Sequence, residues 1–129
     1  MMKILIVDDQ QTWLAYNSKA MYQILGEDII LHTASSAQEG YSKLLESEKE
    51  PYDYIITDMQ METDYLPKPA GEWLIEQAKS LPFCCNTKII IISSLVMIDH
   101  IAKNHNVDYI HKSAAIKSFE PYKELIQSY

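Results

Sequence analysis

The sequence is poor in cysteine and glycine and has no long hydrophobic run, and each scarcity excludes a class of protein. Its two cysteines, Cys84 and Cys85, are neighbours, and neighbouring cysteines rarely pair in a structural disulfide. No Cys-x-x-Cys spacing is present, so the cysteines do not indicate a zinc site. No apolar stretch approaches the roughly 20 residues that span a bilayer, so we expect no membrane helix.

The four histidines, His32, His100, His105 and His111, share no spacing that is typical of metal ligands. The separation between His100 and His105 places them on different faces of a helix. We therefore expect ordinary surface or half-buried histidines rather than a histidine metal site.

The charge balance is acidic and limits the possible partners. The formal net charge is −7 and the sequence pI is about 4.9, which argues against direct binding to nucleic acid or to an anionic membrane. Apolar residues make up 47% of the 129 residues, which excludes a disordered chain and allows one well-packed core. The start of the sequence has too few apolar residues for a signal-peptide core. We expect a soluble, cytoplasmic protein.

Apolar runs of strand length alternate with segments of helical period, which predicts repeated βαβ units and a parallel sheet. The expected strands are residues 3–8, 28–33, 53–57, 88–92 and 107–111. The expected helices are 11–25, one opening at Ser36, 71–80, a short one at 96–105, and a last one from about Ser118 to the end. Residues 1–129 are thus predicted to form one (βα)5 domain of the α/β class, with a doubly wound, five-stranded parallel sheet in the order 2-1-3-4-5.

Local signals support two of these helices. Gly26 fits the position just past the end of the first helix. Ser36 to Glu39 form a capping-box pattern at the start of the second helix. In that helix the expected inward residues are Ala37, Tyr41, Leu44 and Leu45.

Polar residues suited to phosphoryl chemistry stand at the ends of four apolar runs. Asp8 and Asp9 end the first, Asp58 the third, Ser93 and Ser94 the fourth, and Lys112 the fifth. Because the C-terminal ends of parallel strands lie at one edge of a sheet, we expect these side chains to converge on a ligand site there.

An aspartate can act as a nucleophile towards phosphorus and form an acyl phosphate. The reaction needs positive charge, because the carboxylate and the incoming phosphoryl group are both negative. Mg2+ prefers oxygen ligands, which Asp8, Asp9 and Asp58 would supply. A lysine and a serine hydroxyl can each contact a further phosphoryl oxygen.

Together these motifs resemble the receiver domains of bacterial two-component response regulators, in particular the single-domain chemotaxis receivers. The resemblance covers essentially the whole sequence. It rests on residues 3–9, 53–59, 89–94 and 108–112.

The resemblance implies a role for each residue at the strand ends. Asp58 would be the phosphoacceptor, phosphorylated by a sensor histidine kinase or a phosphotransfer protein. Asp8 and Asp9 would bind Mg2+ with Asp58, and Gln60 would add its backbone carbonyl. Lys112 would contact the phosphoryl group. Such a domain is a signalling module rather than an enzyme, with only self-phosphorylation from small donors and autodephosphorylation expected.

The resemblance also implies a switch. The hydroxyl of Ser93 would move to the phosphoryl group, and the small Ser94 would leave room there. Tyr109 would turn inward, and the face formed by the fourth helix, fifth strand and fifth helix would change for a downstream partner that the sequence does not specify. The alternative for Tyr109 is an edge aromatic that only packs.

The sequence departs from the family pattern in four places. Glu62 and Ser113 stand where the family commonly has proline, the second of these often after a cis bond. The loop from Met59 to Ala70 is longer than usual, and the segment between Ser93 and Lys112 is shorter. The long loop, with Glu62, Asp64, Tyr65 and Lys68, is either surface decoration or, by our hypothesis, a partial cover of the site that tunes kinase access or phosphoryl lifetime.

Three other functions compete with that of a receiver. A pseudo-receiver would have the same architecture and signal through protein contacts without phosphorylation. A phosphatase of the aspartate-nucleophile type needs a second aspartate where this sequence has Gln60. A flavodoxin-like electron carrier needs a phosphate-binding loop after the first strand, but none of the three glycines lies there, and Asp8 and Asp9 would repel a flavin phosphate.

Overall fold

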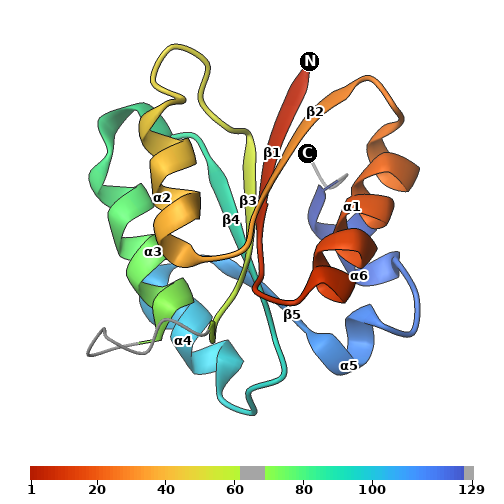
Figure 1. Ribbon diagram of the computed structural model, residues 1–129. Helices are drawn as coiled ribbons and strands as arrows, with labels where there is room; N and C mark the ends of the chain where they lie inside the picture. Colours follow the sequence, from red (N-terminus) through yellow and green to blue (C-terminus); the bar gives the residue numbers. More distant parts are fainter. Residues whose placement is uncertain (62–68, 127–129) are drawn as a thin grey trace.

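The computed structural model describes residues 1–61 and 69–126, which form a parallel sheet with helices on both faces (Figure 1). The strands are β1 (Met2–Val7), β2 (Ile29–Ala34), β3 (Tyr54–Asp58), β4 (Lys88–Ser93) and β5 (Asp108–His111). The helices are α1 (Gln11–Leu25), α2 (Ala37–Leu45), α3 (Ala70–Ser80), α4 (Ile98–His105), α5 (Lys112–Ala115) and α6 (Glu120–Ile126), with a short 3-10 helix, η1, at Pro82–Cys84.

The sheet has the predicted topology. All four strand pairs are parallel, and the order is β2-β1-β3-β4-β5. β4 lies inside the sheet, and its residues Ile89 to Ile92 are buried on both faces, as the purely apolar run predicted. The expected α/β fold is confirmed.

The sheet separates two hydrophobic cores, because successive strand residues point to opposite faces. On one face, Leu5 and Ile91 pack among residues of α2, α3 and α4. On the other, Ile6 and Ile92 pack among residues of α1, α5 and α6. Figure 1 shows the two groups of helices on either side of the sheet.

The predicted helix signals are found in the structure. α1 has the expected bounds, and Gly26 follows it with φ 87°, its N–H donating to the carbonyl oxygen of Tyr22 at 2.9 Å. The Ser36 hydroxyl oxygen caps α2 by accepting from the Glu39 N–H at 3.1 Å. The Glu39 carboxylate accepts from the Ser35 hydroxyl at 3.2 Å. Each strand bound lies within one residue of its predicted position.

Two expectations about helices are wrong. Leu45 is 47% exposed, because neighbouring residues on a helix point in directions about 100° apart and Leu44 already faces the core. The segment after β5 holds two helices rather than one. The short α5 begins directly at Lys112, and the last helix begins at Glu120, two residues later than predicted.

The fourth helix is short, as predicted, with eight residues. Its start lies at Ile98 rather than at residue 96, and Val96 and Met97 before it are largely exposed. Within the two described ranges, no helix combines the length and the apolar character that crossing a membrane requires.

Candidate functional site

Asp58 is the last residue of β3 and lies at the C-terminal edge of the sheet. Its side chain is only 8% exposed, and its Oδ1 accepts from the Met59 N–H at 2.8 Å. β3 pairs with β1 on one side and with β4 on the other. Asp8 follows directly after β1 and Ser93 ends β4, so the predicted convergence of strand ends is found in the structure.

Asp8 is buried beside Asp58, and its two carboxylate oxygens differ in their partners. Oδ1 accepts from the Gln10 N–H at 2.9 Å. Oδ2 is buried and has no hydrogen-bond partner among the described residues, and the Lys112 ammonium lies 3.6 Å from it, beyond hydrogen-bond distance. Because buried carboxylate oxygens are nearly always satisfied, Oδ2 indicates a place for a cation.

Lys112 brings a positive charge to these carboxylates. Its Nζ lies 3.5 Å from Oδ2 of Asp58 and 3.6 Å from Oδ2 of Asp8. The same nitrogen lies 4.8 Å from the centre of the Trp13 ring on α1, where a cation is attracted to the aromatic face. Trp13 was not predicted as part of the site, because its contact depends on how α1 packs beside the end of β5.

Burial makes the negative charge at this edge costly. It raises the pKa of Asp58 to about 6, and the nearby Asp8 carboxylate adds to this rise. Lys112 and the Met59 N–H act in the opposite direction. The pKa of Asp8 is also raised, chiefly by burial. A bound cation would stabilise the charged form of both carboxylates and so offset this cost.

The three predicted acidic metal ligands lie together. One oxygen from each of Asp8, Asp9 and Asp58 lies within 4.8 Å of those of the other two. Asp9 is partly exposed, which would leave room for metal-bound waters. An all-oxygen set with access to water suits Mg2+, and the unsatisfied Oδ2 of Asp8 fits such an ion. Gln60 has an exposed side chain, and the role of its backbone carbonyl stays a prediction.

The predicted switch residues lie on neighbouring strands. Ser93 is 2% exposed, and its Oγ accepts from the Leu95 N–H at 3.1 Å, which leaves its O–H able to donate. Ser94 is exposed. Tyr109, on the edge strand β5, is 44% exposed in this structure. It lies beside an open cavity of about 590 Å³ that residues of α4 and α6 also line.

Gly71 is a residue of the site that sequence reasoning missed. It lies in the first turn of α3, and its N–H donates to the carbonyl oxygen of Met59 at 2.8 Å. A β-carbon at this position would lie 2.7 Å from Cα of Met59 and would collide with the backbone oxygen of Asp58. Only glycine therefore allows α3 to start so close to the end of β3.

Two departures from the family pattern have different outcomes. No peptide bond among residues 1–61 and 69–126 is cis, so the Lys112–Ser113 bond is trans, and Lys112 still reaches Asp58. The predicted cover of the site by Glu62, Asp64, Tyr65 and Lys68 falls on residues outside the described ranges.

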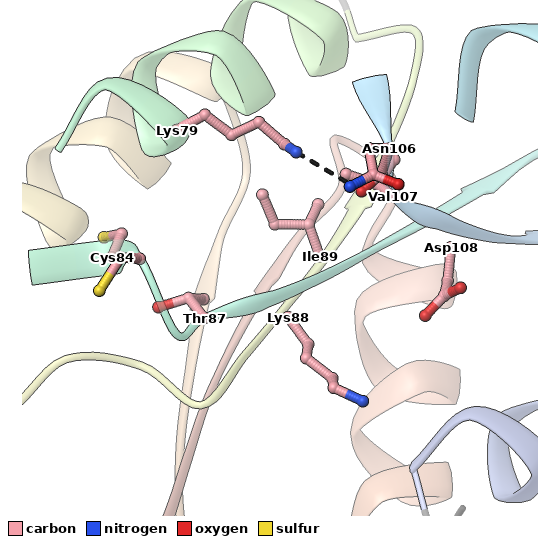
Figure 2. A pocket seen from close by; sticks show the side chains of 9 residues that line it. Lys79, Cys84, Thr87, Lys88, Ile89, Asn106, Val107 and Asp108 are labelled. Carbon is pink, nitrogen blue, oxygen red and sulfur yellow. Dashed lines mark hydrogen bonds between the residues drawn. The ribbon is translucent and has the colours of Figure 1, made fainter. Parts of the chain in front are cut away.

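A separate cavity of about 520 Å³ lies at the opposite end of the sheet, where β4 and β5 begin. Figure 2 shows Lys79 reaching towards Asn106, whose carbonyl oxygen lies 3.5 Å from the lysine Nζ, while Lys88 extends away from Lys79. Asp58 lies at the C-terminal strand ends, beyond which open parallel sheets bind ligands. This cavity is therefore not part of the site around Asp58.

Solved structures with the same fold are receiver domains of response regulators. A response regulator receiver domain protein from Clostridium thermocellum is 27% identical, with 98% of this chain and 99% of that chain covered and a TM-score of 0.66. This chain has the fold of a response-regulator receiver domain. The phosphorylated cyanobacterial phytochrome response regulator RcpA has the same fold, with 22% identity, coverage of 96% and 90%, and a TM-score of 0.72.

One curated protein is also similar to this chain. It is the gliding motility regulatory protein of Myxococcus xanthus, which is 33% identical over 94 residues. Those residues are 73% of this chain but 11% of the length of that protein. No family model matches the chain.

Proposed function

We propose that this receiver domain accepts a phosphoryl group on Asp58 in a reaction that depends on Mg2+. The observation that supports this most is the placement of Lys112 Nζ within 3.6 Å of carboxylate oxygens of both Asp58 and Asp8. That arrangement places a nucleophile, a second acidic ligand and a cation together at one edge of the sheet.

The proposed donor is a phosphohistidine of a sensor histidine kinase or a phosphotransfer protein. A carboxylate oxygen of Asp58 attacks phosphorus, the new O–P bond forms, and the P–N bond to the donor breaks with its electron pair returning to the imidazole. With a pKa of about 6, Asp58 is mostly ionised at neutral pH and can act as the nucleophile.

The surrounding residues would offset the negative charge of the phosphoryl group and of the carboxylates. Asp8, Asp9 and Asp58, with the Gln60 carbonyl, would hold Mg2+, which when bound offsets the negative charge of the carboxylates and the phosphoryl group. Lys112 would move from its shared position between two carboxylates to pair with a phosphoryl oxygen. Phosphoryl transfer depends mainly on such positioning and electrostatics.

The proposed output is a shift between two conformations. A phosphoryl group on Asp58 would accept a hydrogen bond from Ser93, which would favour the conformation with that hydroxyl drawn towards it. The exposed Tyr109 would then turn inward. The face of α4, β5 and α6 would change for a downstream protein, α6 being the helix that the sequence predicted as the fifth.

Phosphorylation with acetyl phosphate in Mg2+, followed by intact mass spectrometry, tests the proposal. We expect the wild-type protein to gain one phosphoryl group and the Asp58→Asn variant to gain none. Phosphorylation of the variant would show that the acceptor is another residue. The opposite result is a wild-type protein that accepts no phosphoryl group from either acetyl phosphate or a phosphorylated phosphotransfer protein. That result would favour the pseudo-receiver that acts through protein contacts alone.

A further inference from the structure

A second group of metal-ligating side chains lies away from Asp58, between α3 and α4. Glu72 and Glu76 are one turn apart on α3, and His105 is the last residue of α4. One ligand atom from each lies within 4.8 Å of those of the other two, and all three residues are partly buried. Figure 1 shows α3 and α4 on the same side of the sheet.

The contacts around this group hold it in place. Nε2 of His105 lies 2.9 Å from Oε1 of Glu72, and their side chains are 16% and 25% exposed. The end of α4 is fixed by Asn106, which adopts the left-handed conformation with φ 55°. The Lys79 ammonium lies 3.5 Å from the Asn106 carbonyl oxygen, so the two helices are also joined next to His105.

We propose that Glu72, Glu76 and His105 form a binding site for a divalent transition-metal ion such as Zn2+, with water as a further ligand. Zn2+ binds imidazole nitrogen and carboxylate oxygen at about 2.0–2.2 Å, so tetrahedral ligand atoms lie about 3.4 Å apart. Small side-chain movements bring the three ligand atoms to that spacing. Carboxylate oxygen and imidazole nitrogen are both ligands that Zn2+ takes in proteins.

The donor set separates this site from the aspartate cluster. Asp8, Asp9 and Asp58 offer oxygen only, which suits Mg2+, whereas an imidazole nitrogen favours zinc-like ions. A bound ion would replace the hydrogen bond between Glu72 and His105 and would fasten the C-terminal end of α4 to α3. This inference does not depend on phosphorylation of Asp58.

Isothermal titration of the full chain with Zn2+, in saturating Mg2+, tests the site. We expect one tight zinc site in the wild-type protein. His105→Gln and Glu76→Gln should weaken it by at least about tenfold, since each removes a direct ligand. His100→Gln, an exposed histidine of the same helix, is the matched control and should leave the affinity unchanged. Equal affinities in the wild type and in His105→Gln would overturn the proposal.

Three further measurements show whether a lost zinc signal comes from loss of this site. Zn2+ should raise the Tm of the wild type and of His100→Gln but not that of His105→Gln, because an ion stabilises only the fold that binds it. Circular dichroism shows whether each variant is folded. An Asp9→Asn variant should keep the tight zinc site, and its loss in that variant would place the ion at the aspartate cluster and overturn the proposal.

Discussion

The ammonium of Lys112 lies 3.5 Å from the carboxylate of Asp58, and it reaches there from the first residue of a short helix rather than from a loop. The same nitrogen contacts Asp8, so one cation serves two buried carboxylates. Both carboxyl groups have raised pKa values, which shows that this single cation only partly offsets their burial.

Replacing Lys112 with methionine should raise the pKa of Asp58 above its value of about 6, because Lys112 lowers it. Carboxyl-carbon NMR titration measures this shift. Phosphorylation by acetyl phosphate should also slow, on the order of 10²-fold, as expected for loss of one stabilising group at a charged transition state. Lys117→Met, at an exposed lysine nearby in sequence, should change neither quantity. An unchanged phosphorylation rate in Lys112→Met would contradict the role proposed for this lysine.

The free energy of unfolding should fall as the pH rises from about 4 to about 6 in the absence of divalent ions. The pKa of Asp58 in the folded protein lies above its ordinary value, so protonated Asp58 favours the folded state, and this stability is lost as the pH passes about 6. The shift of about two pKa units corresponds to about 3 kcal/mol. Urea unfolding across this range measures it. Asp58→Asn should lack most of this slope, and parallel slopes in both proteins would exclude Asp58 as its source.

Alanine at Gly71 should destabilise the protein by about 1–3 kcal/mol or more, because a β-carbon would collide with the backbone of Asp58 and Met59. Gly40→Ala is a matched control in α2. There the nearest atom is a side-chain methyl of Val7 at 3.0 Å, which can move, so the cost should be smaller. Urea unfolding compares the two variants. Equal costs would mean that the backbone at Gly71 can shift freely.

Mg2+ should change the fluorescence of Trp13. The Lys112 ammonium lies over its ring, and an ion at the aspartate cluster would compete with that ammonium for the carboxylates. A Trp73→Phe background leaves Trp13 as the reporter, since the sequence has two tryptophans. We expect a saturable change on titration with MgCl2. Adding Asp9→Asn should move the midpoint to much higher Mg2+, and identical titrations would argue against Asp9 as a ligand.

Much of this fold could be read from local sequence. Runs such as Ile89 to Ile92 have the length and composition of buried strands, so strand positions were predicted within one residue. The short α5 was missed, because four residues carry no helical period. The prediction that Leu45 faces the core was wrong, because the sequence of two adjacent leucines does not show which of them is buried.

The sequence by itself determined which residues gather at the site, because parallel strands end at one edge and Asp8, Asp58, Ser93 and Lys112 stand at those ends. Their contacts with the helices were decided only by the tertiary structure. The close approach of Gly71 depends on how α3 packs on the sheet. The pairing of Glu72 with His105 joins two helices whose spacing in sequence carries no signal. The edge at which a parallel strand ends follows from the direction of the backbone. The packing of helices depends on contacts between side chains that lie far apart in the sequence.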